Sequence, residues 1–176
     1  GIVIVSATYR LQQGLRALGA WFSPVDDALA REHLTPPLYA LYRTMRRSER
    51  QHSLRVLRDL RDQGYSDPDL LAAALLHDVG KTRAPFSIPE KVLVVLVKAF
   101  APRLYRRWGS DSSRGWRRPF AVSTQHPAWG ATIVAQAGGT PRTIELIRHH
   151  ADPLPGPPAS DTERLLLALQ QADERN

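Results

Sequence analysis

Six histidines and seventeen acidic side chains supply most of the groups that could do chemistry in this chain of 176 residues, which has no cysteine. Without thiols, a metal site has to use nitrogen and oxygen ligands, and a disulfide framework, an iron–sulfur cluster and a cysteine nucleophile are excluded. The most informative pair is His77-Asp78, which ends the most apolar stretch of the sequence. A buried carboxylate is costly unless it is paired or binds a cation. The pair is therefore a candidate metal site.

Two interpretations of this dipeptide are open from the residues alone. In the first, His77 and Asp78 bind a metal ion at a helix end, because adjacent helical residues point about 100° apart and reach one ion only where other elements converge. In the second, Asp78 pairs with Lys81 or caps the helix, and His77 is an ordinary core histidine. His52 favours the first, because a helical hairpin that turns at residues 64–67 brings it to the height of His77.

Asp173 is a third candidate carboxylate position. It follows an apolar helix face made of Leu165, Leu166 and Leu169, so it lies on or beside the core. The alternative for Asp173 is a polar residue that frays in the last turn of its helix.

The elements that must position these residues are helices. Apolar residues at helical spacing, capping boxes and prolines at first turns predict an all-α fold of eight or nine helices. The expected helices cover about 7–20, 24–33, 38–45, 48–63, 66–79, 87–101, 126–139, 140–150 and 161–174. We expect one domain over residues 1–176, with its core at about 40–174 and the helices of 7–37 packing on it. Residues 103–120 contain six arginines and one acid and are interpreted as a basic surface loop or lid.

The charge and hydropathy of the chain bear on its partners. The net charge is +7, and 21 of the 24 basic residues are arginine, which indicates either an anionic partner or a GC-rich genome. A nucleic acid is one such partner, with Trp108 or Trp116 stacking on bases. No apolar run approaches the ~18 residues that a membrane span needs, so we expect no membrane partner and a cytoplasmic protein.

His52, His77-Asp78 and Asp173, in this order, resemble the HD-domain superfamily of metal-dependent phosphohydrolases. Residues 70–81, LLAAALLHDVGK, are similar to the signature helix of that superfamily, and the resemblance extends over about 40–174. It implies that these four residues bind one metal ion.

Two further motifs resemble the binuclear branch of the superfamily. They are HPAWGATI, which contains His126, and IRHHAD, which contains His149. The resemblance implies that these two histidines bind a second ion and that Asp78 bridges both. Iron, manganese or magnesium suits such nitrogen and oxygen ligands, and zinc is possible.

The same motifs are similar to the HD-GYP cyclic-dinucleotide phosphodiesterases. The Gly-Tyr-Pro motif is absent, since residues 151–158 read ADPLPGPP, and we do not expect hydrolysis of cyclic dinucleotides. His150 and Glu49 are the candidates for a third ion or for a supporting role around the first two.

The resemblance implies hydrolysis of a phosphate ester or anhydride, with a nucleotide or another small phosphorylated compound as substrate. Asp78 and Lys81 are the expected catalytic residues, and Lys81 and Arg83 the expected phosphate-binding ones. Two alternatives remain: a mixed-valence di-iron oxygenase similar to myo-inositol oxygenase, which uses the same ligand order, and a non-catalytic metal-dependent binding module. The oligomeric state cannot be predicted from these features.

Overall fold

A computed structural model describes residues 25–84, 87–110 and 115–176. These residues form nine α-helices and two short 3-10 helices, and none of them is in a strand. The all-α expectation is therefore confirmed. The helix expected over about 7–20 lies outside the described residues. Within the described part of the chain, no helix is both long and apolar enough to cross a membrane.

The N-terminal half is a set of short helices around one apolar helix. α2 (Asp27–His33) and α3 (Pro36–Thr44) lead into the longer α4 (Arg47–Asp62), which a turn with a left-handed Gly64 connects to α5 (Pro68–Leu76). The Asp67 side chain caps α5 by accepting the backbone N–H groups of Asp69 and Leu70. Every residue of α5 from Leu70 to Leu76 is buried, so this helix is the centre of the bundle.

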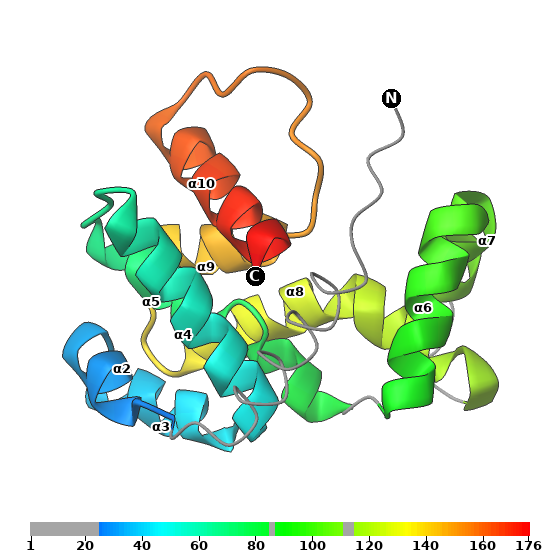
Figure 1. Cartoon of the computed structure of the whole chain (residues 1–176), viewed down its shortest axis with the longest axis horizontal. Helices are drawn as coiled ribbons and strands as arrows, with labels where there is room; N and C mark the ends of the chain where they lie inside the picture. Colours follow the sequence, from blue (N-terminus) through cyan, green and yellow to red (C-terminus); the bar gives the residue numbers. More distant parts are fainter. Residues whose placement is uncertain (1–24, 85–86, 111–114) are drawn as a thin grey trace, which may run out of the picture.

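The C-terminal half completes the bundle (Figure 1). The 3-10 helix η1 (Val79–Arg83) follows α5, and α6 (Ile88–Phe100) and α7 (Pro102–Gly109) form a pair at one end of the molecule. After η2 (Gly115–Arg117), the helices α8 (Arg118–Gln136), α9 (Pro141–His149) and α10 (Asp161–Arg175) return to the bundle. α10 packs on α4, α5 and α9.

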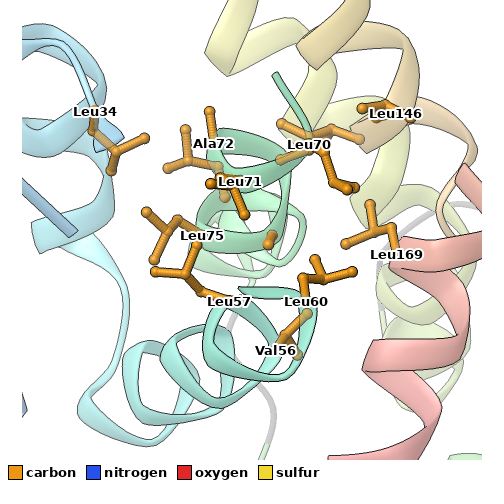
Figure 2. Packing of buried hydrophobic residues seen from close by; sticks show 14 of the residues in the cluster. Leu34, Val56, Leu57, Leu60, Leu70, Leu71, Ala72, Leu75, Leu146 and Leu169 are labelled. Atoms are coloured by element: carbon orange, nitrogen blue, oxygen red, sulfur yellow. The ribbon is translucent and has the colours of Figure 1, made fainter. Parts of the chain in front are cut away.

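The main core joins helices from both halves. Leu57 and Leu60 of α4, Leu70 of α5 and Leu169 of α10 lie in one buried cluster (Figure 2). Because α4, α5 and α10 share this cluster, the residues that these three helices carry are held in fixed relative positions. His52, His77 and Asp173 are among those residues.

The interpretation of residues 103–120 as a loop was wrong for most of its length. Residues 102–109 are α7 and residues 115–117 are η2, and α8 begins at Arg118 rather than at His126; residues 111–114 lie outside the described part. Arginine is a good helix former, so a run of arginines does not indicate a loop. Tyr105 and Trp108 of α7 pack on Phe120, which explains why this basic segment is ordered into helices.

Gly80 sets the distance between η1 and α8. A Cβ atom at this position would lie 2.0 Å from the backbone oxygen of His126 and 2.7 Å from the backbone nitrogen of Gly130. Glycine is therefore required here for close approach. This contact places the segment that follows Asp78 directly against the helix that carries His126.

Candidate metal centre

Six histidine and aspartate side chains from five parts of the fold form the candidate centre. α4 contributes one histidine, the α5–η1 junction a His-Asp pair, α8 and the end of α9 one histidine each, and α10 one aspartate. Their ligand atoms make two compact groups among the described residues, with the atoms of each group within 4.8 Å of one another. We call His52, His77 and Asp173 the outer group, and Asp78, His126 and His150 the inner group.

The outer group is partly open to solvent. Nε2 of His52 lies 2.7 Å from Oδ1 of Asp173, and Nε2 of His77 lies 3.5 Å from the same oxygen. His77 is fully buried, whereas the other two side chains are partly exposed. The structure thus brings together three residues that the sequence predicted as ligands, and all three point ligand atoms at one place.

The inner group is buried throughout. Nε2 of His126 lies 3.2 Å from Nε2 of His150 and 3.5 Å from Oδ1 of Asp78. The three residues come from the α5–η1 junction, from the middle of α8 and from the C-terminal cap of α9. Three separate elements therefore converge on this group, as an ion-binding site requires.

Asp78 and His150 connect the two groups. Oδ1 of Asp78 is 3.7 Å from Nε2 of His77, and the rings of His77 and His150 are in edge contact with centroids 5.1 Å apart. One carboxylate oxygen is therefore close to a ligand nitrogen of each group. This arrangement fits a carboxylate that is shared by two ions.

The hydrogen bonds of three histidines assign their tautomers. Nδ1 of His77 donates to the carbonyl of Ala74, Nδ1 of His126 to that of Ser123, and Nδ1 of His150 to that of Ile147, at 2.9, 3.0 and 2.7 Å. With the proton on Nδ1, each Nε2 keeps a lone pair for a cation. The helix backbone thus orients these rings as metal ligands commonly are oriented.

Pro127 explains one of these bonds. A proline in a helix has no N–H to donate to the carbonyl four residues earlier, which here is Ser123. The ring of His126, the residue just before the proline, donates to this carbonyl instead. Pro127 therefore does not end the helix, and it supplies an acceptor that fixes the orientation of His126.

The residues present fit a cation at both groups. Nε2 of His77 is buried and finds no hydrogen-bond partner in the described part of the chain. In the inner group, the Nε2 atoms of His126 and His150 are 3.2 Å apart. With the assigned tautomers, neither atom carries a proton, which is unfavourable unless a positive charge lies beside them. Metal ions would satisfy all three nitrogens, and imidazole with carboxylate suits first-row divalent ions.

The protonation states agree with this fit. Burial and the ammonium of Lys81 lower the pKa of His126 to about 3, and burial together with His77 lowers the pKa of His150 to about 4. Both rings are neutral at pH 7, which is the form that binds metal. Burial opposes ionisation of Asp78, but Lys81 and the nearby imidazoles outweigh it and hold the pKa of Asp78 well below its usual range.

The two carboxylates attract positive charge into the centre. Burial disfavours the charged form of His77, but Asp78 and Asp173 outweigh that effect and raise the pKa of His77. His52 and His77 in turn hold the pKa of Asp173 far below its usual range, against the opposing effect of burial. Lys81 supplies a cation within contact of Asp78, where its Nζ lies 2.6 Å from the carboxylate.

The structure corrects the choice between His149 and His150. His150 is only 6 % exposed and belongs to the inner group. The side chain of His149 is 45 % exposed, and its Nδ1 is 2.8 Å from Oδ2 of Asp152. The prediction that His149 faces the centre was therefore wrong, because adjacent residues of a helix point about 100° apart and the phase of α9 was assigned incorrectly.

The other predicted residues have different positions. Glu49 is buried, and its Oε2 accepts the backbone N–H of Arg46 at the start of α4, so it stabilises a helix end and lies outside both ligand groups. Lys81 is partly exposed and pairs with Asp78, as the second interpretation of the dipeptide anticipated. Arg83 is exposed at the end of η1.

Comparison with known proteins adds one finding. The family described as HD domain matches residues 50–175, a span that contains all six ligand-group residues. Neither the curated proteins nor the solved structures gave a match to this chain. Because the match covers more than half of the sequence, and because the His-Asp centre lies inside it, the chain belongs to the HD-domain family, which is a family of metal-dependent hydrolases.

Proposed function

We propose that this protein hydrolyses a phosphate ester or anhydride in a small phosphorylated compound, such as a nucleotide, at a centre of two divalent ions. The observation that carries the proposal is the position of Asp78. Its Oδ1 lies 3.7 Å from Nε2 of His77 in the outer group and 3.5 Å from Nε2 of His126 in the inner group. A carboxylate shared in this way suits two adjacent ions, which is the arrangement of many phosphoryl-transfer centres.

Each ligand group would hold one ion. His52, His77 and Asp173 would bind the first, His126 and His150 the second, and Asp78 both. Iron, manganese or magnesium is our first expectation and zinc is an alternative. When bound, such a pair supplies Lewis acidity and lowers the pKa of a bound water towards neutrality.

Lys81 is our candidate for binding a substrate phosphate. Its side chain is 23 % exposed, so it lies between the buried carboxylate of Asp78 and solvent. A cation that binds Asp78 would replace Lys81 as its counter-charge, and the ammonium would then be available for a phosphate oxygen. Arg83, two residues further along η1, is a weaker candidate for the same role.

The test is a comparison of metal content with phosphate release. The purified protein is depleted of metal, reloaded with Mn²⁺, Fe²⁺, Mg²⁺ or Zn²⁺, and offered p-nitrophenyl phosphate, bis-p-nitrophenyl phosphate and a panel of nucleotides. We expect hydrolysis that needs metal, that is lost in Asp78→Asn, and that persists in His149→Ala. The His149 variant is a matched control because it removes a histidine next to the centre that lies outside both groups.

Two outcomes would replace the proposal. Oxygen consumption by the iron-loaded protein, with an EPR signal after partial oxidation and no phosphate release, would indicate the di-iron oxygenase. Full metal loading with no turnover of any substrate class would indicate the non-catalytic binding module.

A further inference from the structure

The pair of helices α6 and α7 carries apolar side chains that the rest of the protein leaves uncovered. Within the described residues, all the large apolar side chains that are largely exposed lie on α6, α7 or η2. Phe100 is 84 % exposed, Val95 64 % and Trp116 61 %. The full set is Val92, Leu93, Val95, Leu96, Phe100, Leu104 and Trp116. We call the five members on α6 the apolar face of α6.

This apolar face is one side of an anchored helix. Val92, Leu96 and Phe100 are four residues apart and lie in one row, and the other members of the face flank this row. The opposite side of α6 packs inward, because Val94 and Val97 contact the cluster around Phe120. The apolar face is therefore held outward by packing on its reverse side.

The net charge of the protein is concentrated in the same segment. Residues 87–118 contain eight basic and two acidic side chains, whereas the rest of the chain contains 16 basic and 15 acidic ones. Lys98 of α6 and Arg103, Arg106 and Arg107 of α7 are all exposed. Because α6 and α7 lie together at one end of the molecule (Figure 1), their apolar and cationic side chains are presented on the same part of the protein.

We propose that the apolar face of α6 and the arginines of α7 bind the surface of an anionic lipid bilayer. With 13 residues, α6 is about 20 Å long, which is too short to cross the roughly 30 Å hydrocarbon core but suits a helix that lies in the interface. Interfacial helices combine such an apolar side with lysine and arginine that contact anionic headgroups. The expectation of no membrane partner was based only on the absence of an apolar run long enough to span a membrane. A helix that binds at the membrane surface does not need such a run.

Other occupants fit the observations less well. A nucleic acid would pair with the arginines but would leave the valines and leucines of α6 uncovered, since it offers few aliphatic contacts. A second copy of this chain would bring two strongly basic segments together. Residues 1–24 contain two arginines and no acid, so they offer no charge to complement the arginines of α7.

Vesicle flotation of the whole 176-residue chain tests the proposal. The probes are vesicles of pure phosphatidylcholine and vesicles that contain about 30 % phosphatidylglycerol. We expect the protein to float with the anionic vesicles, to bind neutral ones much more weakly, and to dissociate as salt is raised. No flotation with anionic vesicles would overturn the proposal. So would equally strong binding to neutral vesicles.

Two pairs of variants locate the surface. Val92→Ser/Leu96→Ser/Phe100→Ser should reduce binding to anionic vesicles by more than about 30-fold while circular dichroism stays unchanged, because exposed side chains contribute little to folding. Arg106→Gln/Arg107→Gln should weaken binding roughly 25-fold, at about fivefold for each cation near the surface. The charge-matched control, Arg55→Gln/Arg148→Gln, removes two exposed arginines elsewhere and should bind as the unmodified protein does.

The same preparations separate the alternatives. The protein could bind a single-stranded oligonucleotide and not the vesicles, with oligonucleotide binding lost only in the arginine variant. That result would indicate a nucleic-acid surface and overturn the proposal. A concentration-dependent dimer that is lost in the serine variant, together with no vesicle binding, would indicate self-association. That result would also overturn the proposal.

Discussion

The outer and inner ligand groups use the same kinds of side chain, yet the protein leaves them in different states. In the outer group, two partly exposed residues satisfy each other, since Nε2 of His52 and Oδ1 of Asp173 are 2.7 Å apart. In the inner group, all three residues are buried, and the Nε2 atoms of His126 and His150 face each other at 3.2 Å.

The free energy needed to remove an ion therefore differs between the two groups. Without metal, the outer group keeps a charge-assisted hydrogen bond between His52 and Asp173, although Nε2 of His77 has no hydrogen-bond partner among the described residues. The inner group keeps two opposed lone pairs in a buried space, which is costly. We therefore expect the inner ion to be the more tightly held of the two. The outer ion should be the first to exchange.

Replacing the shared carboxylate of Asp78 should remove both metal ions, so that neither ligand group stays occupied. Asp78→Ala removes the group that lies close to both sets of ligands and leaves Lys81 without its counter-charge. We predict loss of both ions, a fall in turnover of more than about 100-fold, and a lower melting temperature. Elemental analysis and calorimetry of the purified variant measure these effects. Two metal ions per chain in this variant would contradict the account.

Removing one ligand of the inner group should release one metal ion and leave the other bound. His150→Ala is predicted to lose one ion and to keep the other, because His52, His77 and Asp173 remain in place. His149→Ala should keep both ions, since that side chain is exposed beside Asp152. Metal analysis of the two variants side by side decides the matter. The opposite pattern would mean that α9 presents the other histidine when metal binds.

Replacing Lys81 should lower turnover without changing the number of bound metal ions. Lys81→Met removes a cation that contacts the inner group through Asp78, and metal ions can supply the missing counter-charge. If the substrate is a phosphate compound, we predict a loss of about 10²-fold in turnover with both ions retained. Steady-state kinetics of the metal-loaded variant provides the measurement. Full activity would remove Lys81 from the phosphate-binding role.

The packing behind the inner group should respond to a single methyl group. In Gly80→Ala, the new Cβ would meet backbone atoms of His126 and Gly130, so η1 and α8 must move apart. We predict a loss of about 1–3 kcal/mol in the free energy of unfolding and weaker binding of the inner ion. Urea denaturation monitors the first effect. Gly156→Ala is the control, because no heavy atom of the described residues lies within 4 Å of its added Cβ; an equal loss there would remove the packing explanation.

For the outer group, the residues alone indicated a position near the core, and the resemblance to the HD-domain superfamily added the expectation that they bind metal. His52 and His77 are related by a short helical hairpin, and Asp173 follows an apolar face, so hydrophobic periodicity alone places all three near the core. The inner group was harder because its third ligand depends on the phase of α9. The buried residues Leu146 and Ile147 lie four and three residues before His150. That spacing favours His150 and was a signal the prediction overlooked.

Two features, one in α8 and one in the segment that precedes it, were missed for different reasons. Pro127 suggested a helix start, although the ring of His126 replaces the missing backbone donor through a hydrogen bond to Ser123, three residues earlier. The arginines of residues 103–118 suggested a loop, although Tyr105 and Trp108 had the spacing to pack on a neighbouring helix. In the second case a local rule was overridden by contacts with Phe120, a residue distant in sequence.

The number of metal ions per chain, measured in three proteins, tests whether the centre holds two ions that share Asp78. The protein, purified without chelator and saturated with Mn²⁺, is compared with His52→Ala and His150→Ala by elemental analysis after gel filtration. We predict two ions per chain in the unmodified protein and one in each variant. The ion that His52→Ala keeps should be the more resistant to a chelator. A single ion in the unmodified protein, or loss of all metal in either variant, would contradict a centre made of two groups that share Asp78.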